Sequence, residues 1–185
     1  MLTTLESLRQ YLGKDGADTQ DDDLLFETIK RKSKVVNNFL DRNIEAQTYT
    51  EYYRGDGTNC LMVRQYPIIS ITSIYDDVGR VWPESTKKDP TTIAISNQTP
   101  GLIQLTGDIF INSAWWNWYN IENIKITYVA GYSTIPYDIE EAVNKLCSVE
   151  YAKSKGMMAG VKSDRDPKSL EDEAFEVLSD YKRIR

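Results

Sequence analysis

Histidine is absent from this 185-residue sequence, and cysteine occurs only twice. Without histidine the chain cannot form a Ser-His-Asp or Cys-His nucleophilic arrangement, and it lacks the commonest zinc ligand and general base. Cys60 and Cys147 lie far apart in the sequence, so we expect two buried thiols rather than a disulfide bond or a metal site. These absences disfavour most hydrolytic and metal-dependent enzymes, and no cofactor is expected.

The sequence also lacks a long apolar run and a surplus of positive charge. No stretch approaches the roughly 18 apolar residues that mark a membrane-spanning helix, and no charged-then-apolar leader is seen, so we expect neither membrane insertion nor export. The net charge of −6 disfavours tight nonspecific binding to nucleic acids, because no basic stripe is available to neutralise phosphates. Synthesis in the cytoplasm is expected.

A strand followed by a helix organises the C-terminal part of the chain. Residues 124–130 alternate large apolar side chains with smaller or polar ones, which predicts a half-buried strand ending at Gly131. Asp138 and Glu141 can then form an acidic capping box for a helix that reaches residue 153. One broad face of this helix is apolar and should be buried. That face is formed by Ile139, Ala142, Val143, Leu146, Cys147 and Val149.

Helices are predicted at both ends of the chain. Thr3 and Glu6 form a capping box for a short first helix, and Asp21 or Asp22 can cap a longer helix that reaches residue 40. A last helix should begin at Ser169. Its apolar stripe is narrow and suits packing against one partner helix, within this chain or outside it. The stripe consists of Leu170, Ala174, Val177, Tyr181 and Ile184.

Between these helices the sequence has the period of β-structure. Residues 48–54 and 60–63 flank a turn and predict a hairpin. Residues 68–75 predict another strand. Weaker strand signals lie at residues 81–82, 92–95, 102–105 and 109–111. We therefore predict an α+β fold that is mainly a helical bundle, with two N-terminal and two C-terminal helices and an inserted antiparallel β unit. The helical domain comprises residues 1–45 and 132–185, and the β unit residues 46–131, in a single compact protein.

Few residues in this sequence are arranged for catalysis. The carboxylate pairs Asp76/Asp77 and Asp164/Asp166 lie in turn-like polar contexts and are expected to be solvated loop residues. Residues 55–57 contain two glycines but are not followed by the Gly-Lys-Ser/Thr of a phosphate-binding loop. We expect no enzymatic activity. The remaining enzyme hypothesis is a hydrolase that uses Asp76 or Asp77 with a divalent metal.

The least ordinary stretch is an aromatic segment, defined here as Trp115, Trp116, Trp118 and Tyr119. Its flanking Asn and Ser residues predict a loop or hairpin tip, where so many large rings cannot all be buried by their own segment. Three roles stay open. The rings could cover the core of the β unit, contact another subunit or partner, or stack on sugars or bases.

Several different short motifs follow one another along nearly the whole chain, and their order matches that in a known protein family. They are Thr3-Leu5-Leu8-Tyr11-Leu12, Asp21-Asp22-Asp23-Leu24-Leu25, Tyr66-Pro67-Ile68-Ile69-Ser70-Ile71, and Ile126-Thr127-Tyr128-Val129-Ala130-Gly131-Tyr132 followed by Ile135-Pro136-Tyr137-Asp138-Ile139 and Ala142. In this order they resemble the head-to-tail connector proteins of tailed bacteriophages, also called adaptor or head-completion proteins. The resemblance implies a structural virion protein that forms a ring, commonly a dodecamer, on the portal vertex and links the head to the tail.

The resemblance also implies partners and surfaces. The partners are the portal protein, further copies of this chain and the next tail or stopper protein, while DNA passes through the ring without specific binding. The aromatic segment is expected to contact a neighbouring subunit or a tail component. Alternatively, it makes the chain a carbohydrate- or peptide-binding module. The residues expected to dock on the portal are Leu170, Ala174, Val177, Tyr181, Lys182, Arg183 and Arg185.

Overall fold

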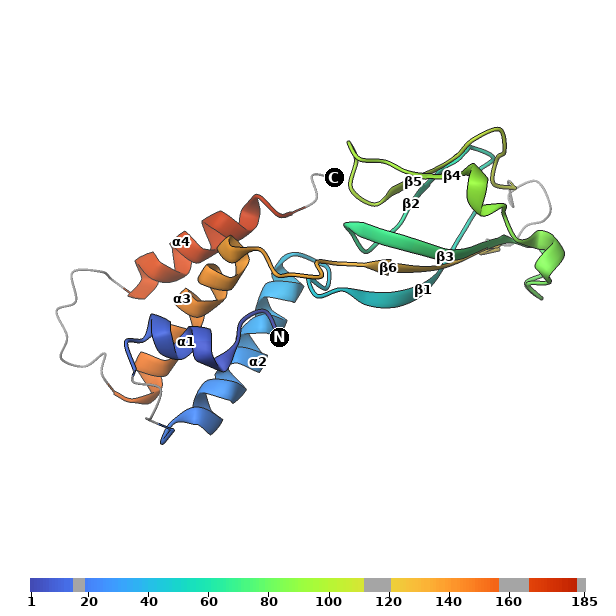
Figure 1. The fold of residues 1–185 in the computed structure, drawn as a ribbon. Coiled ribbons are helices and arrows are strands. Elements are labelled where there is room, and N and C mark those ends of the chain that lie inside the picture. The colour runs from blue at the N-terminus through green and yellow to red at the C-terminus, as the bar shows by residue number, and fades with distance from the viewer. Residues whose placement is uncertain (15–18, 112–120, 157–166, 183–185) are drawn as a thin grey trace. The chain divides into compact units, whose positions relative to one another are not determined.

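The computed structural model describes residues 1–14, 19–111, 121–156 and 167–182 (Figure 1). These residues form four α-helices, two short 3₁₀ turns and six β-strands. The helices are α1 (Leu5–Tyr11), α2 (Asp22–Phe39), α3 (Tyr137–Ser154) and α4 (Pro167–Ser179). The strands are β1 (Gln47–Tyr53), β2 (Cys60–Met62), β3 (Ile68–Asp76), β4 (Ile93–Ile95), β5 (Leu102–Leu105) and β6 (Ile124–Ala130).

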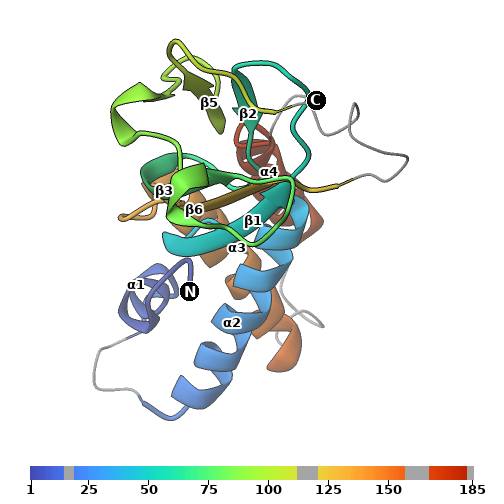
Figure 2. The same cartoon turned by 90° about the vertical axis from the view of Figure 1, so that its right-hand side faces the viewer.

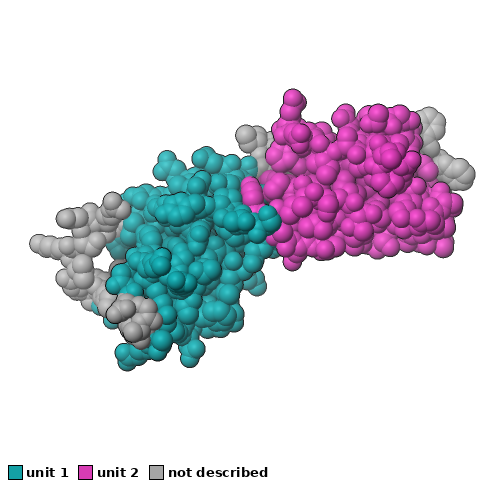
Figure 3. All heavy atoms as spheres, in the orientation of Figure 1, with its two compact units in different colours: residues 1–45, 133–185 teal, residues 46–132 magenta. Residues whose placement is uncertain are grey.

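The chain divides into two compact units (Figure 3). Unit 1 comprises Met1–Glu45 and Ser133–Arg185 and contains the four helices, whereas unit 2 comprises Ala46–Tyr132 and contains the six strands. The prediction of a mainly helical bundle is wrong. Of the described residues, 39% are helical and 23% lie in strands, so the fold is mixed α+β with two three-stranded antiparallel sheets.

Unit 1 is a group of four helices around α3. The views in Figures 1 and 2 show α3 beside α2, and α3 also packs against α4, while α1 contacts both α2 and α3. The apolar face predicted for residues 139–149 is buried: each of its six predicted residues is at most 3% exposed. Burial on this scale stabilises a helix far more than its intrinsic propensity does.

The predicted helix caps are displaced in the structure. Thr4, not Thr3, caps α1, and its hydroxyl accepts a hydrogen bond from the Ser7 amide at 3.1 Å. The Thr3 hydroxyl instead donates to Asn144 Oδ1 at 2.8 Å. Helix α4 begins at Pro167, before the predicted Ser169, because proline suits the first turn of a helix.

Helix α3 begins at Tyr137 with Pro136 at its N-cap position, so Asp138 lies in its first turn and does not cap it. Asp21 occupies the N-cap position of α2 but makes no capping bond. Its carboxylate accepts hydrogen bonds from Tyr151 Oη at 2.6 Å, from Lys14 Nζ at 2.9 Å and from Lys155 Nζ. These bonds, with that of Lys155 the largest, hold the pKa of Asp21 far below its usual value. The Asp21 carboxylate therefore bonds to side chains elsewhere in unit 1 instead of capping α2.

Unit 2 contains two sheets with strand orders β1-β6-β3 and β2-β5-β4. The central strand β6 pairs antiparallel with both neighbours, from Gln47↔Ala130 to Tyr53↔Ile124 on the β1 side. Its burial alternates perfectly along the strand, as the sequence predicted. The chain enters and leaves the unit at one place, where the Ala46 amide donates to the Tyr132 carbonyl at 3.1 Å.

The predicted hairpin of residues 48–54 and 60–63 does not form. Strand β1 pairs with β6 and strand β2 with β5, so the two belong to different sheets. The cause lies in the connection between them: the Gly55 amide donates to Asn123 Oδ1 at 2.8 Å, and an added Cβ at Gly55 would meet the Ile111 carbonyl oxygen at 2.0 Å. The weak strand signals at residues 81–82 and 109–111 also do not correspond to strands.

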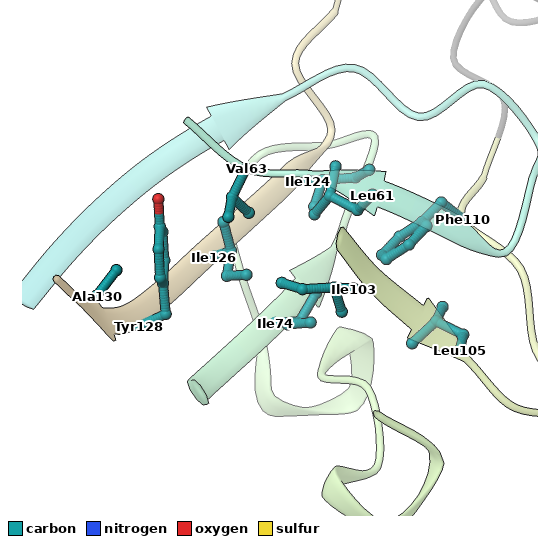
Figure 4. Close-up of a cluster of buried hydrophobic side chains, with 10 residues drawn as sticks. All are labelled: Leu61, Val63, Ile74, Ile103, Leu105, Phe110, Ile124, Ile126, Tyr128 and Ala130. Carbon is teal, nitrogen blue, oxygen red and sulfur yellow. The ribbon is translucent and has the colours of Figure 1, made fainter. Parts of the chain in front are cut away.

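One apolar cluster fills the interior of unit 2 (Figure 4). Strand β6 contributes alternate residues to it, and the side chains of both sheets meet there. The cluster consists of Leu61, Val63, Ile74, Ile103, Leu105, Phe110, Ile124, Ile126, Tyr128 and Ala130. The two cysteines do not pair: Cys147 is buried in α3, whereas Cys60 is half-exposed, in contrast to the prediction of two buried thiols.

Replacing Ile126 by alanine tests the importance of this cluster. Ile126 is fully buried, so Ile126→Ala should lower the free energy of unfolding by about 2–5 kcal/mol. The matched control is Ile69→Ala, because Ile69 lies in the same sheet and is 47% exposed. Urea denaturation followed by circular dichroism measures both variants. Equal losses at the two positions would contradict the assignment of the core.

Candidate functional site

The residues predicted to dock on the portal lie on or just after α4, and several of them face their own unit. Ala174 is fully buried and is therefore inaccessible to a partner. Leu170, Val177 and Tyr181 are half-buried, and Lys182 is exposed. Arg183 and Arg185 lie outside the described residues.

The end of α4 is fixed by aromatic and polar contacts. The rings of Phe175 and Phe39 lie 4.8 Å apart, and Lys182 Nζ lies 3.7 Å from the centroid of Phe39. The Tyr181 hydroxyl donates to Asp138 Oδ2 at 3.0 Å. These contacts join α4 to both α2 and α3, so the segment that follows Lys182 starts from a well-defined place on unit 1.

The opposite face of α4 is acidic. Asp172 and Glu176 on the helix and Asp180 just after it are spaced by four residues and are exposed, which places them on one face. Within the described part of the chain, none of the three forms an ion pair. A partner that approaches this face of α4 from solvent therefore meets negative charge.

An aromatic group with one cation lies on the β1-β6-β3 sheet, on the face that points away from the core. We call it the Trp82 cluster; it consists of Tyr52, Tyr75, Trp82 and Lys125. In the strand register Lys125 lies between Tyr52 and Tyr75. Its Nζ is 5.8 Å from the Tyr75 centroid and 5.9 Å from that of Trp82, and the rings of Tyr52 and Trp82 are 5.8 Å apart. Such contacts stabilise a cation on an aromatic surface.

Asp77 holds the loop that carries Trp82. Its carboxylate accepts hydrogen bonds from the amides of Gly79 at 2.9 Å, and of Val81 and Trp82 at 2.8 Å each. These bonds, led by that of Trp82, hold the pKa of Asp77 below its usual value. Arg80 and Trp82 have positive φ angles of 56° and 59°. The carboxylate therefore stabilises an unusual backbone that places Trp82 on the sheet.

Asp76 belongs to a buried polar network. It is 4% exposed and accepts hydrogen bonds from Asn123 Nδ2 and from the Ile111 amide, each at 2.6 Å. Lys88 Nζ lies 3.5 Å from Asp76 Oδ2. Through Asn123 the network also reaches the Gly55 amide, so it joins four separate segments of unit 2. Satisfied networks of this kind make a fold specific.

The two carboxylates considered for hydrolysis are thus occupied with structural hydrogen bonds. Across residues 1–14, 19–111, 121–156 and 167–182, no three His, Cys, Asp or Glu side chains lie close enough together to hold a metal ion. Asp164 and Asp166 lie outside these ranges, so their predicted role as solvated loop residues stays a prediction. No helix among the described residues is long and apolar enough to cross a membrane.

The aromatic segment of Trp115, Trp116, Trp118 and Tyr119 also lies outside the described residues. Its predicted roles in subunit or tail contact, or in carbohydrate or peptide binding, stay predictions. The network around Asp76 does fix Ile111 and Asn123, which flank this part of the chain.

The Trp82 cluster was missed by sequence reasoning. The alternation over residues 124–130 does place Lys125 on the outer face of a strand. Trp82 reaches that face because Asp77 holds the amides two, four and five residues further on, an arrangement that strand or helix periodicity does not reveal. Residues 81–82 were instead interpreted as a weak strand.

Comparison with models of protein families shows which family this chain belongs to. The model of the head completion protein family matches residues 1–162. The chain belongs to the head completion protein family. This membership confirms the predicted resemblance to connector proteins, and it confirms the role as a structural head–tail connector of a phage-like virion. A search of curated proteins finds no match.

The fold of this head completion protein also occurs in solved particles. It is similar to a chain in the virion of a native gene transfer agent particle, with a TM-score of 0.66, 14% identity and coverage of 100% of this chain and 91% of the other. A chain from the neck of an empty gene transfer agent particle, computed with C6 symmetry, gives a TM-score of 0.63 at 12% identity and the same coverage. A chain from the native neck, computed with C12 symmetry, gives 0.62 at 12% identity, covering 98% and 88%.

The role of Asp77 in this head completion protein can be tested through pH. Its folded-state pKa lies below the unfolded value of about 3.8, so its stabilising effect is complete above about pH 4 and is lost as the pH falls through the folded-state pKa. Asp77→Asn should therefore be less stable than the wild type at pH 7, and the difference should shrink towards pH 2.5. Thermal unfolding across this range measures the effect.

Asp172→Asn is the matched control for this comparison, because Asp172 is exposed on α4. It should leave stability at pH 7 unchanged within about 0.5 kcal/mol. A difference between Asp77→Asn and the wild type that stays constant down to pH 2.5 would argue against stabilisation by the ionised carboxylate.

Proposed function

We propose that this head completion protein forms a ring on the portal vertex, joins the DNA-filled head to the tail and lets DNA pass through the ring. The observation that carries the proposal is the family match over residues 1–162. A ring requires a surface that meets a different surface on the next copy, because only such heterologous contacts close into a cycle. The related folds from particle necks computed with C6 and C12 symmetry support a cyclic assembly, and a dodecamer in particular.

The connector role needs no catalysis, and we propose that the chain has none. Asp76 and Asp77 support this, because their carboxylates are engaged by main-chain amides and by Asn123. A structural role also suits a fold in which buried polar groups hold loops together rather than face a cavity.

The charge of the chain suits the passage of DNA. At a net charge of −6, a ring of copies repels phosphates on average, which opposes adhesion of DNA in transit. We therefore propose that DNA is not a specific ligand. The partners proposed are the portal protein, further copies of the chain and the next tail or stopper protein.

The portal contact is proposed for the end of α4 and the residues that follow it. Phe175, Tyr181 and Lys182 fix the end of α4 on unit 1, and Arg183 and Arg185 follow it in the sequence. Because they follow α4 in the sequence, and α4 has an acidic face, a portal surface with both acidic and basic groups would be complementary.

Reversing the charge of the tail tests this contact. Arg183→Glu combined with Arg185→Glu should weaken portal binding by at least about tenfold, since rim and buried charges at interfaces contribute on this scale. The contacts of Tyr181 and Lys182 remain, so the melting temperature should not change. Lys34→Glu combined with Arg64→Glu changes the net charge equally at exposed sites elsewhere and serves as the control. Equal weakening by both pairs would reject a specific tail contact.

The ring itself is tested by mass. Native mass spectrometry of the purified chain, alone and mixed with portal rings from the same genome, should give a closed ring or saturable, stoichiometric decoration of the portal. A monomer alone does not contradict the proposal when decoration occurs, because the portal can act as template. A chain that stays monomeric and leaves the portal mass unchanged would overturn it.

A further inference from the structure

Strand β1 is an open edge of its sheet. All seven of its residues pair with β6, from Gln47↔Ala130 to Tyr53↔Ile124, without a register shift. On its other side, no main-chain hydrogen bond joins residues 47–53 to another described segment. Among the residues that the structure describes, alternate amide and carbonyl groups of β1 therefore have no main-chain partner along the strand.

The other edges in unit 2 are short or protected. Strand β3 has two register shifts, and residues 87–88 cover part of its edge through the Tyr75↔Lys87 bridge and a 2.8 Å bond from the Lys88 amide to the Ile74 carbonyl. Strands β2 and β4 have three residues each. Bulges, lysines and shortness are the usual means by which proteins prevent edge pairing.

Strand β1 has none of these protections. It contains no lysine, proline or glycine, and its threonines and tyrosines favour extended structure. Its one charged residue, Glu51, is turned to the inner side, where it accepts a 2.6 Å hydrogen bond from the Tyr128 hydroxyl and another from Tyr53. That contact raises the pKa of Tyr128, although burial contributes more. The charge of Glu51 therefore does not oppose the pairing of another strand with the edge of β1.

We propose that the outer edge of β1 accepts an extended segment of a different protein of the particle neck as an additional strand. This inference rests on the proposed connector function. Main-chain hydrogen bonds along the edge would supply affinity, and side chains at alternate positions would supply specificity.

A second copy of this chain fits the edge less well. Pairing of two β1 edges would be a two-fold contact, which cannot propagate around a cyclic ring. A heterologous contact would need another free edge of similar length, and in the part of the chain that the structure describes β2, β3 and β4 offer none. The described strands of a second copy therefore do not match this edge, and the occupant that we propose is a strand of a different protein.

The side chains of β1 define the chemistry of that strand. On the outer face Tyr52 is backed by the ring of Trp82, so an aromatic or β-branched residue opposite Tyr52 would be favoured. Thr48 and Thr50 are exposed on the same face and suit small or hydroxyl-bearing neighbours. The complementary segment is thus an uncharged strand with a large side chain at one end.

Hydrogen exchange tests the inference without a mutation. In the free chain, the outward amides of β1 should exchange fast. In purified particles from the same genome, exchange over residues 47–53 should slow by at least about tenfold. Strand β6, paired on both sides, is the internal control and should be protected in both states. Absence of the chain from particles would refute the connector function, whereas its presence with β1 unprotected would refute only the strand addition.

Two neighbouring prolines provide a second test. Adjacent amides point to opposite sides of a strand, so of Gln47→Pro and Thr48→Pro, both at exposed positions, one disrupts pairing with β6 and the other removes only an edge donor. The variant that keeps the wild-type melting temperature should be lost from particles by about tenfold or more. Its incorporation at the wild-type level would overturn the proposal.

A photo-crosslinking residue at Thr48 identifies the occupant. A crosslink to a different protein of the particle supports the proposal, and a crosslink to another copy of this chain overturns the choice of occupant.

Discussion

Burial of alternate residues along β6 is the interaction on which the rest of unit 2 depends. Ile124, Ile126, Tyr128 and Ala130 are each at most 1% exposed, and both neighbouring strands pair with the same seven residues. A slip of one residue would turn all four to the other face. The strand therefore fixes the register of β1 and β3 together, and the outer face and the open edge follow from that register.

Hydrogen bonds of polar side chains then hold the loops and connecting segments that the apolar cluster does not fix. Asp76 and Asn123 tie together segments that are distant in sequence, and Asp77 accepts hydrogen bonds from three amides of the loop that carries Trp82. In unit 1, Asp21 plays a comparable part with Tyr151, Lys14 and Lys155. In a family of structural proteins such carboxylates hold surfaces in place. Asp76 and Asp77, which the sequence suggested as a carboxylate pair, are thus both engaged in hydrogen bonds that hold backbone segments in place.

Elements that depend on local periodicity were predicted correctly from the sequence. Elements whose pairing depends on contacts between distant residues were not. The strand at residues 124–130 and the buried face of α3 followed from spacing alone. The hairpin failed because Gly55 is held by Asn123, a residue far along the chain. The fold was placed too close to a helical bundle because short strands such as β2 and β4 give weak signals. The family was recognised from the order of loose motifs. The Trp82 cluster was not, because it needs both the Asp77 hydrogen bonds to the amides of residues 79, 81 and 82 and the pairing of β1, β6 and β3, which brings Tyr52, Lys125 and Tyr75 together.

The hydrogen bond between the Ala46 amide and the Tyr132 carbonyl has a consequence for the order of folding. Helices α1 and α2 leave the ribosome before all of unit 2. Their apolar faces can pack against α3 only later, because α3 is synthesised after unit 2 and before α4. When unit 2 closes, this bond joins the points where the chain enters and leaves it, so the long loop between α2 and α3 becomes a short one. Most of the entropy of bringing the helices together is then already lost. Unit 2 therefore lowers the entropic cost of packing the helices that precede it in the sequence against those that follow it.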